Sequence, residues 1–219
     1  MPHRNSVELG FAVAGIATVL FWPVSIYCQT LRENYNPLQR SLSELALGSL
    51  GWIQMINFIF VGLLIIGFTV GLFRHVKNSH QPLFRVGVCL LLTTGIEIII
   101  IAFVPTAPYV DMTLRPTPHG IIAGTLISFL MIASFLLLPA LKADPRWRGL
   151  YWYTLATGIA AVIIGSLRAM APFVWVYFGL HERLLLANGT IWFVVMGVRL
   201  LQIVRQEIKE KQLTSVERV

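Results

Sequence analysis

Residues 50–73 read LGWIQMINFIFVGLLIIGFTVGLF, an apolar run without a charged residue that is long enough to cross a bilayer as an α-helix. The run is continuous, whereas the strands of membrane β-barrels alternate apolar and polar residues. Six such runs are present, at residues 9–30, 50–73, 83–104, 120–141, 150–170 and 184–204. We therefore expect an all-α, polytopic membrane protein whose residues 1–219 form a single bundle of six transmembrane helices.

The composition agrees with a membrane location. Of the 219 residues, 56% are hydrophobic and only 12% are charged, against about 25% charged in ordinary soluble domains. The net charge of +7 comes from basic residues that collect on one side of the predicted spans. This is the positive-inside pattern, which places both termini in the cytoplasm and makes the lipid bilayer, rather than a nucleic acid, the expected partner.

The first outward connection carries an amphipathic segment, NPLQRSLSELALG, at residues 36–48. Asn36 is a suitable N-cap and Gly48 a natural stop, so a short interfacial helix is predicted over residues 37–47. Its polar face would consist of Arg40, Ser43 and Glu44. Such a helix can act as a lid over the bundle or simply connect two spans along the bilayer surface.

Polar residues inside the spans fall mostly in the outer halves. They are Ser25, Gln29, Gln54, Asn57, Thr125, Ser128, Ser166, Arg168, Asn188 and Thr190. Polar groups that face lipid are costly, so these side chains should face the bundle interior or water. The distribution predicts an outward-opening polar cavity, and the alternative is that each residue only hydrogen-bonds one helix to another.

Glu97 is the one acidic residue near the middle of a span. It lies eight residues before Pro105, about 12 Å from the outer end at 1.5 Å per residue. A carboxyl group at this depth must be paired, hydrated or protonated, and Arg168 is the candidate partner by depth.

Four further residues of the outer connections should surround the same opening: Asp111, His119, Glu182 and Arg183. We expect ion pairs of Arg40 with Asp111 and of Glu44 with Arg183, each worth about 1 kcal/mol or less. His119 lies at a helix N-terminus, which favours a neutral ring that can accept a proton or bind a metal. The alternative for His119 is a structural histidine bonded to a loop carbonyl or to water.

No cofactor or metal site is predicted. Cys28 and Cys89 lie at opposite membrane depths, and the sequence has neither a CxxC pair nor a His/Cys cluster. It also lacks paired mid-membrane histidines for haem and the HExxH and GxSxG motifs.

The stretch YNPLQRSLSELALG at residues 35–48, followed by Trp52 and by a His–Gly pair that opens span 4, resembles a known family. These are the prokaryotic six-span proteins catalogued as domain of unknown function 998. The matching positions are Tyr35, Asn36, Pro37, Ser43, Glu44 and Leu45. The family's compact Phe-Pro-x-Asp loop is spread here over Phe103, Pro105 and Asp111. The resemblance covers nearly the whole chain and implies a six-span fold in a prokaryotic cell membrane, but no established activity.

Three functions stay open from the residues. We rank first a non-enzymatic protein that binds a lipid, an isoprenoid or another amphipathic small molecule in the outward-facing cavity. An intramembrane lipid-modifying enzyme would instead use Glu97 or Asp111 with His119 as an acid–base pair. The third is an accessory subunit of a membrane complex.

Overall fold

The computed structural model describes residues 2–77, 79–106, 117–170 and 176–216, and these contain helices but no strand. Six helical stretches are long and apolar enough to cross a membrane: Asn5–Thr30, Trp52–His75, Pro82–Ile101, Pro118–Ala143, Arg148–Leu167 and Phe178–Thr214. The predicted all-α, six-span fold is therefore confirmed. The last stretch is longer than predicted at both ends.

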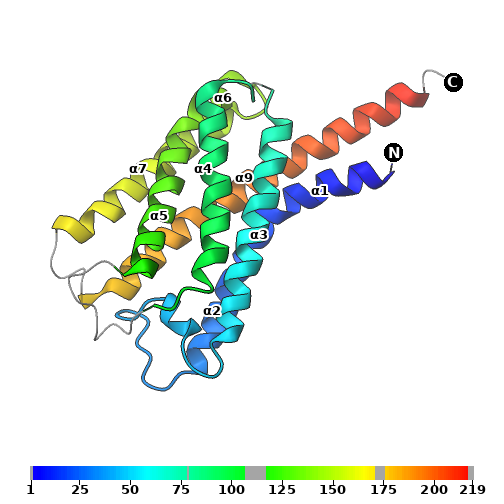
Figure 1. Cartoon of the computed structure of the whole chain (residues 1–219). Helices are drawn as coiled ribbons and strands as arrows, with labels where there is room; N and C mark the ends of the chain where they lie inside the picture. Colours follow the sequence, from blue (N-terminus) through cyan, green and yellow to red (C-terminus); the bar gives the residue numbers. More distant parts are fainter. Residues whose placement is uncertain (1, 78, 107–116, 171–175, 217–219) are drawn as a thin grey trace.

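Ten elements make up these spans and one connection. They are α1 (Pro2–Ala17), the 3-10 helix η1 (Thr18–Leu20), α2 (Phe21–Thr30), the 3-10 helix η2 (Ser43–Ala46), α3 (Trp52–His75), α4 (Pro82–Ile101), α5 (Pro118–Leu136), α6 (Leu138–Ala143), α7 (Arg148–Met170) and α9 (Phe178–Val216). Figure 1 shows α9 crossing the bundle and continuing beside α1, so both termini lie at one end. We call this the terminal end, and the opposite end, which carries residues 31–51, the far end.

Proline explains why two of the spans are interrupted. Pro23 in α2 has no N–H to offer the carbonyl of Val19, and the first span tightens to the 3-10 helix η1 at that level. Pro139 has the same effect in the fourth span, where α5 ends and α6 begins around Leu137.

Glycines let the helices approach closely at two crossings. A Cβ atom on Gly197 of α9 would lie 2.8 Å from the backbone nitrogen of Ile16 in α1. A Cβ on Gly62 of α3 would lie 2.6 Å from the carbonyl oxygen of Gly95 in α4. In a membrane the hydrophobic effect does not drive helices together, because lipid is as apolar as the side chains. Small residues at crossings let the helices pack closely instead.

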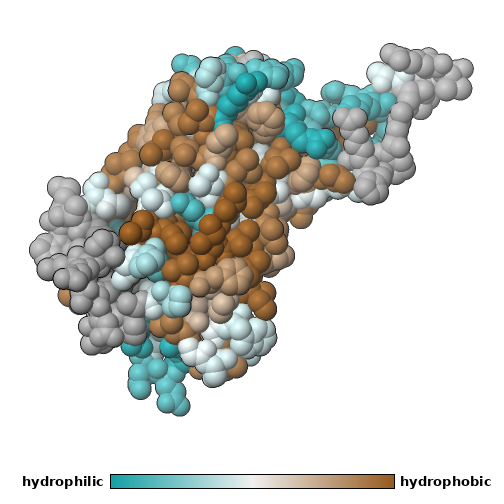
Figure 2. Space-filling view, in the orientation of Figure 1, coloured by the Kyte–Doolittle hydropathy of each residue, from teal (hydrophilic) through white to brown (hydrophobic). Residues whose placement is uncertain are grey.

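The lateral surface is apolar. Large hydrophobic side chains point outward, among them Trp152, which is 70% exposed, and Phe103, which is 64% exposed. Figure 2 shows hydrophobic residues across the middle of the visible face and hydrophilic residues toward its ends. An exposed apolar surface of this extent is expected for contact with lipid rather than with water.

Arg146, in the connection between α6 and α7, joins several helices at the terminal end. Its guanidinium donates to Oδ2 of Asp144 at 2.9 Å, to Oε1 of Glu207 at 2.6 Å and to the carbonyl of His75 at 2.6 Å. Arg199 of α9 donates to the carbonyl of Arg146 at 2.7 Å. In the sequence, Arg146 is one of the basic residues of the positive-inside pattern, which does not indicate this role.

The same network continues through His75 at the end of α3. Its ring nitrogens face Oε2 of Glu8 in α1 at 3.1 Å and Oε2 of Glu207 in α9 at 3.0 Å. The imidazolium form can donate to both carboxylates at once. Arg74 completes the set with an ion pair to Oε1 of Glu8 at 2.6 Å. Ion pairs of Arg74 with Glu8 and of Arg146 with Glu207 therefore connect α1, α3 and α9 at the terminal end.

Asp144 is the most buried member of this network. Burial of the carboxylate opposes ionisation, but hydrogen bonds from the side chain of Arg146 and from the amides of Lys77 and Arg146 outweigh it and hold the pKa of Asp144 below its usual value. The carboxylate therefore stabilises the fold above its unfolded-state pKa of about 3.9, and this contribution is lost as the pH falls through the folded-state pKa.

Asp144→Asn should destabilise the protein by about 2–3 kcal/mol, because it leaves the charge of Arg146 with fewer partners. For a chain of this size the expected fall in Tm is about 5–10 °C in a thermal-unfolding measurement in detergent. Glu210→Gln is the control, because Glu210 is an exposed acid on the same side of the bundle. Equal Tm values for the two variants would contradict the role given to Asp144.

Candidate functional site

The segment between the first two spans is folded differently from the single helix predicted over residues 37–47. A turn closes after Asn36, whose carbonyl accepts from the amide of Arg40 at 2.8 Å, and the 3-10 helix η2 follows over Ser43–Ala46. Ser41 and Glu44 explain the break. The amide of Ser41 donates to Oε1 of Glu44, and the amide of Glu44 donates to Oγ of Ser41, both at 3.2 Å. This reciprocal pair has the pattern of a capping box and lies directly before η2, while the predicted cap Asn36 accepts from the amide of Leu38 at 3.0 Å in the preceding turn.

The segment docks on the first turn of α9. The amides of Gly179 and Leu180 donate to the carbonyls of Gln39 at 3.2 Å and Leu38 at 2.9 Å. The first amides of a helix have no partner within the helix, and here another part of the chain supplies one. Position 179 requires glycine, since a Cβ there would overlap the carbonyl oxygens of Pro37 and Arg40.

Glu182 and Arg183 of α9 both bind the segment. Oε2 of Glu182 accepts from the amide of Leu42 at 2.7 Å, and Arg183 donates to the carbonyl of Arg40 at 3.0 Å. The segment is thus held against the bundle and does not lie splayed over lipid.

The ion pairs of the segment differ from those predicted. Glu44 pairs with Arg40, at 3.4 Å between Oε2 and Nε, instead of with Arg183. The prediction was wrong because the capping bond to Ser41 already fixes the carboxylate of Glu44 beside Arg40. The predicted pair of Arg40 with Asp111 lies outside the described residues, as does Asp111 itself.

Tyr35 connects the segment to α9 through hydrogen bonds. Its hydroxyl donates to the carbonyl of Ser41 at 2.7 Å and accepts from Arg183 at 2.8 Å, and the guanidinium carbon of Arg183 lies 5.8 Å from the ring centroid. Burial raises the pKa of Tyr35 to about 12, with the hydrogen bond and charge of Arg183 acting in the opposite direction. In the sequence, Tyr35 stands out only as part of the family pattern, which does not indicate this role.

Tyr35→Phe should loosen the segment, because it removes a donor to Ser41 and an acceptor for Arg183. We expect the free energy of local opening to fall by about 1.4 kcal/mol. Hydrogen exchange at the amides of Leu42 and Leu180 should then be about tenfold faster. The neutral phenol is the stabilising form, so its contribution is complete below the unfolded-state pKa of about 10 and is lost as the pH rises through about 12.

Tyr27→Phe is the matched control for this prediction, because the side chain of Tyr27 is exposed and lies at the same end of the first span. If exchange at the two amides changes equally in both variants, the hydroxyl of Tyr35 does not hold the segment.

Ser25, Gln54 and Asn57 bind one another between α2 and α3. Asn57 donates to the hydroxyl of Ser25 at 3.2 Å, to Oε1 of Gln54 at 3.3 Å and to the carbonyl of Phe21 at 3.0 Å. Ser25 and Gln54 are also hydrogen-bonded, at 3.2 Å. All three side chains are buried. Their hydrogen bonds join two spans, which is the alternative that the sequence left open for them.

Glu97 faces α5, where Oε1 accepts a hydrogen bond from the hydroxyl of Thr125 at 2.8 Å. This agrees with the prediction of a polar partner inside the bundle. The predicted partner was Arg168, whose side chain lies outside the described part of the structure. The second oxygen, Oε2, is buried and has no hydrogen-bond partner among the described residues.

His119 fits the structural alternative. Its Nδ1 donates to the carbonyl of Val104 at 2.7 Å, which makes a neutral ring present Nε2 as an acceptor. The side chain is only 6% exposed, and Nε2 is buried without a partner among the described residues. The described residues also contain no group of three or more His, Cys, Asp or Glu side chains that could hold a metal ion.

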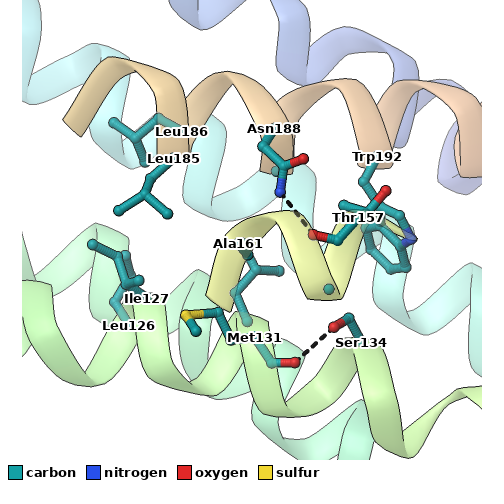
Figure 3. Close-up of a pocket in the computed structure, with 13 residues that line it drawn as sticks. Leu126, Ile127, Met131, Ser134, Thr157, Ala161, Leu185, Leu186, Asn188 and Trp192 are labelled. Carbon is teal, nitrogen blue, oxygen red and sulfur yellow. Dashed lines mark hydrogen bonds between the residues drawn. The ribbon is translucent and has the colours of Figure 1, made fainter. Parts of the chain in front are cut away.

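A narrow crevice lies between α5, α7 and α9 (Figure 3). Its volume is about 40 Å³, and its walls are mostly apolar, with Leu126, Met131 and Leu185 among them. Asn188 is the one residue of the predicted cavity that lines it, and Asn188 donates to the carbonyl of Thr157 at 3.1 Å.

A larger pocket of about 200 Å³ lies at the far end, between the end of α2 and the chain that leads into α3. Its lining residues are Cys28, Leu31, Arg32, Glu33, Leu45, Leu47, Gly48, Ser49, Leu50 and Gly51. We call it the Arg32 pocket. Arg32 donates through its guanidinium to the carbonyl of Glu44, so the docked segment forms one wall.

Arg32 and Glu33 did not belong to the predicted site. The signal in the sequence is a pair of opposite charges directly after an apolar span, at the membrane boundary. The segment was expected to present Arg40, Ser43 and Glu44 to a cavity, whereas Ser43 and Glu44 are buried within the fold.

Comparison with known proteins gives a family but no relative with an assigned role. Neither a curated protein nor a solved structure matches the chain. The family model described as "Protein of unknown function (DUF998)" matches residues 15–199. This range runs from the end of α1 into α9, and the chain therefore belongs to this family.

Proposed function

We propose that the protein binds an amphipathic membrane lipid, or a small molecule of similar character, with the polar part of the ligand in the Arg32 pocket. The supporting observation is a pocket of about 200 Å³ that combines two charged residues with four leucines at the end of a membrane span. Polar groups in a ligand site orient the ligand, and the leucines of this pocket offer apolar contacts beside them.

The position of the pocket suits a lipid. Arg32 lies two residues after the last residue of α2, where a transmembrane helix leaves the apolar region. The orientation expected from the basic residues places this end outside, so the ligand would come from the outer leaflet. Leucines in the lining offer contacts to the first carbons of its chains, while the headgroup stays near the boundary.

The pocket is also built from parts that are held in place. Arg32 binds the carbonyl of Glu44, Glu44 closes the capping box with Ser41, and Glu182 binds the amide of Leu42. Walls that are fixed before binding lower the entropic cost of ordering the site around a ligand.

The Arg32 pocket is larger than the crevice of Figure 3, which makes it the better candidate for a ligand. At about 40 Å³ the crevice exceeds the 10–15 Å³ that holds a water, but it offers little room for a headgroup. Lipid-modifying chemistry by Glu97 and His119 ranks lower, because neither residue lines either pocket.

Leu47→Trp should fill the pocket and reduce the retained lipid at least tenfold. The measurement is native mass spectrometry of protein released from lipid nanodiscs. Leu47 follows η2 in an extended backbone conformation, which tryptophan can also adopt without strain. Leu38→Trp is the matched control, since Leu38 lies in the same segment, is 46% exposed and does not line the pocket.

The proposal fails if wild type retains no lipid after the surrounding lipids are removed. It also fails if the Leu47 and Leu38 variants retain as much lipid as wild type, because the bound lipid would then lie elsewhere on the helix surface.

A further inference from the structure

We infer that the Arg32 pocket selects a zwitterionic headgroup of the phosphoethanolamine type, with the phosphate on Arg32 and the ammonium group on Glu33. This inference rests on the proposed function and adds the chemical class of the ligand. It follows from the charges that line the pocket and from the bonds that these charges make.

The lining contains one cation and one anion, adjacent in the sequence, and its other residues are uncharged. A purely anionic ligand would neutralise Arg32 but would bring its charge close to Glu33. A purely cationic ligand would do the reverse. A ligand that carries both charges can neutralise both residues. A site rejects the wrong ligand when binding would place like charges close together.

Neither charge is paired by the protein among the described residues. Arg32 makes its hydrogen bond to a backbone carbonyl, that of Glu44, and no ion pair joins it to a carboxylate there. The exposed carboxylate of Glu33 has no hydrogen bond or ion pair to another described residue. Unlike the charges of the terminal end, these two are left available for a ligand.

The two side chains offer hydrogen-bonding groups that complement those of the ligand. A guanidinium carries five N–H donors, so the bond to Glu44 leaves several for phosphate oxygens. Its planar fork suits phosphate better than an ammonium point charge would. A primary ammonium has three donors for the carboxylate of Glu33, and two carbons between phosphate and nitrogen let both groups reach neighbouring residues.

The leucines of the lining argue for a lipid rather than for free phosphoethanolamine. Leu47 and Leu50 line the same pocket as the charged pair, and Leu50 is 47% exposed. An apolar side chain at the rim gains burial from the glycerol and first acyl carbons of a lipid, at about 25 cal/mol per Å² of apolar surface. The headgroup alone would leave this surface exposed.

The test is lipid competition in nanodiscs that contain equal amounts of phosphatidylethanolamine, phosphatidylcholine and phosphatidylglycerol with identical chains. Native mass spectrometry then gives the ratio of the lipids retained. We expect wild type to retain phosphatidylethanolamine about tenfold over phosphatidylglycerol, which lacks the ammonium group. Glu33→Gln should abolish this preference while lipid is still retained.

Glu210→Gln is the matched control, because it removes the same charge from an exposed acid that lies in α9 and does not line the pocket. Arg32→Lys keeps the charge but loses the planar fork, and should weaken retention of all three lipids. Retention of phosphatidylcholine equal to that of phosphatidylethanolamine, with both above phosphatidylglycerol, would overturn the phosphoethanolamine type, because the quaternary ammonium of choline has no N–H donor for Glu33.

The failure of the inference is distinct from the failure of the proposed function. Lipid that is retained without preference, or a preference unchanged in Glu33→Gln, would overturn the zwitterionic assignment while lipid binding stands. Absence of retained lipid from wild type would overturn lipid binding itself. Stabilisation by millimolar phosphoethanolamine in the absence of lipid retention would overturn the lipid as its source.

Discussion

The far end of the bundle depends on the hydrogen bonds that the amides of Gly179 and Leu180 donate to the carbonyls of Gln39 and Leu38. The first amides of a helix have no partner within the helix, and an unpaired amide at a buried residue such as Gly179 is expensive. The connection between the first two spans supplies the acceptors. By docking there, it fixes the carbonyl of Glu44, which in turn binds Arg32 and forms a wall of the pocket.

The two ends of the bundle use charge in opposite ways. At the terminal end, carboxylates and cations from α1, α3 and α9 and from the connection before α7 are matched within the protein, and Asp144 is fully buried among its donors. At the far end, Arg32 and Glu33 line an open pocket without such matching. Matched charges give a stable junction but leave nothing for a ligand, because a new partner would have to replace a good one. Recognition is therefore better placed at the far end.

The sequence predicted the spans well and the contacts between them poorly, for a physical reason. A transmembrane helix needs about 20 apolar residues in a row, which is a local property. The partners of Arg146 and Glu182 lie 61 and 140 residues away in the chain, and no local pattern encodes such distances. The segment shows the same limit on a smaller scale. Asn36 and Ser41 both cap a turn here, since Asn36 accepts from the amide of Leu38 and Ser41 from the amide of Glu44, so the chain forms two short turns where one helix was predicted.

Depth explains why the polar residues of the spans need not line a ligand site. A charged group at mid-membrane is costly, and Glu97 at this level has one oxygen bonded to Thr125 and the other buried. Ser25, Gln54 and Asn57 likewise use their hydrogen-bonding groups on one another, so their one-sided distribution reflects where α2 meets α3. Arg32 and Glu33 lie at the boundary, where water and headgroups reduce the cost of an unpaired charge. A protein can keep charges available for a ligand at lower cost there than in the membrane interior. This difference in cost is the physical reason for proposing the ligand site at the charged pair after α2 and not at the polar residues inside the bundle.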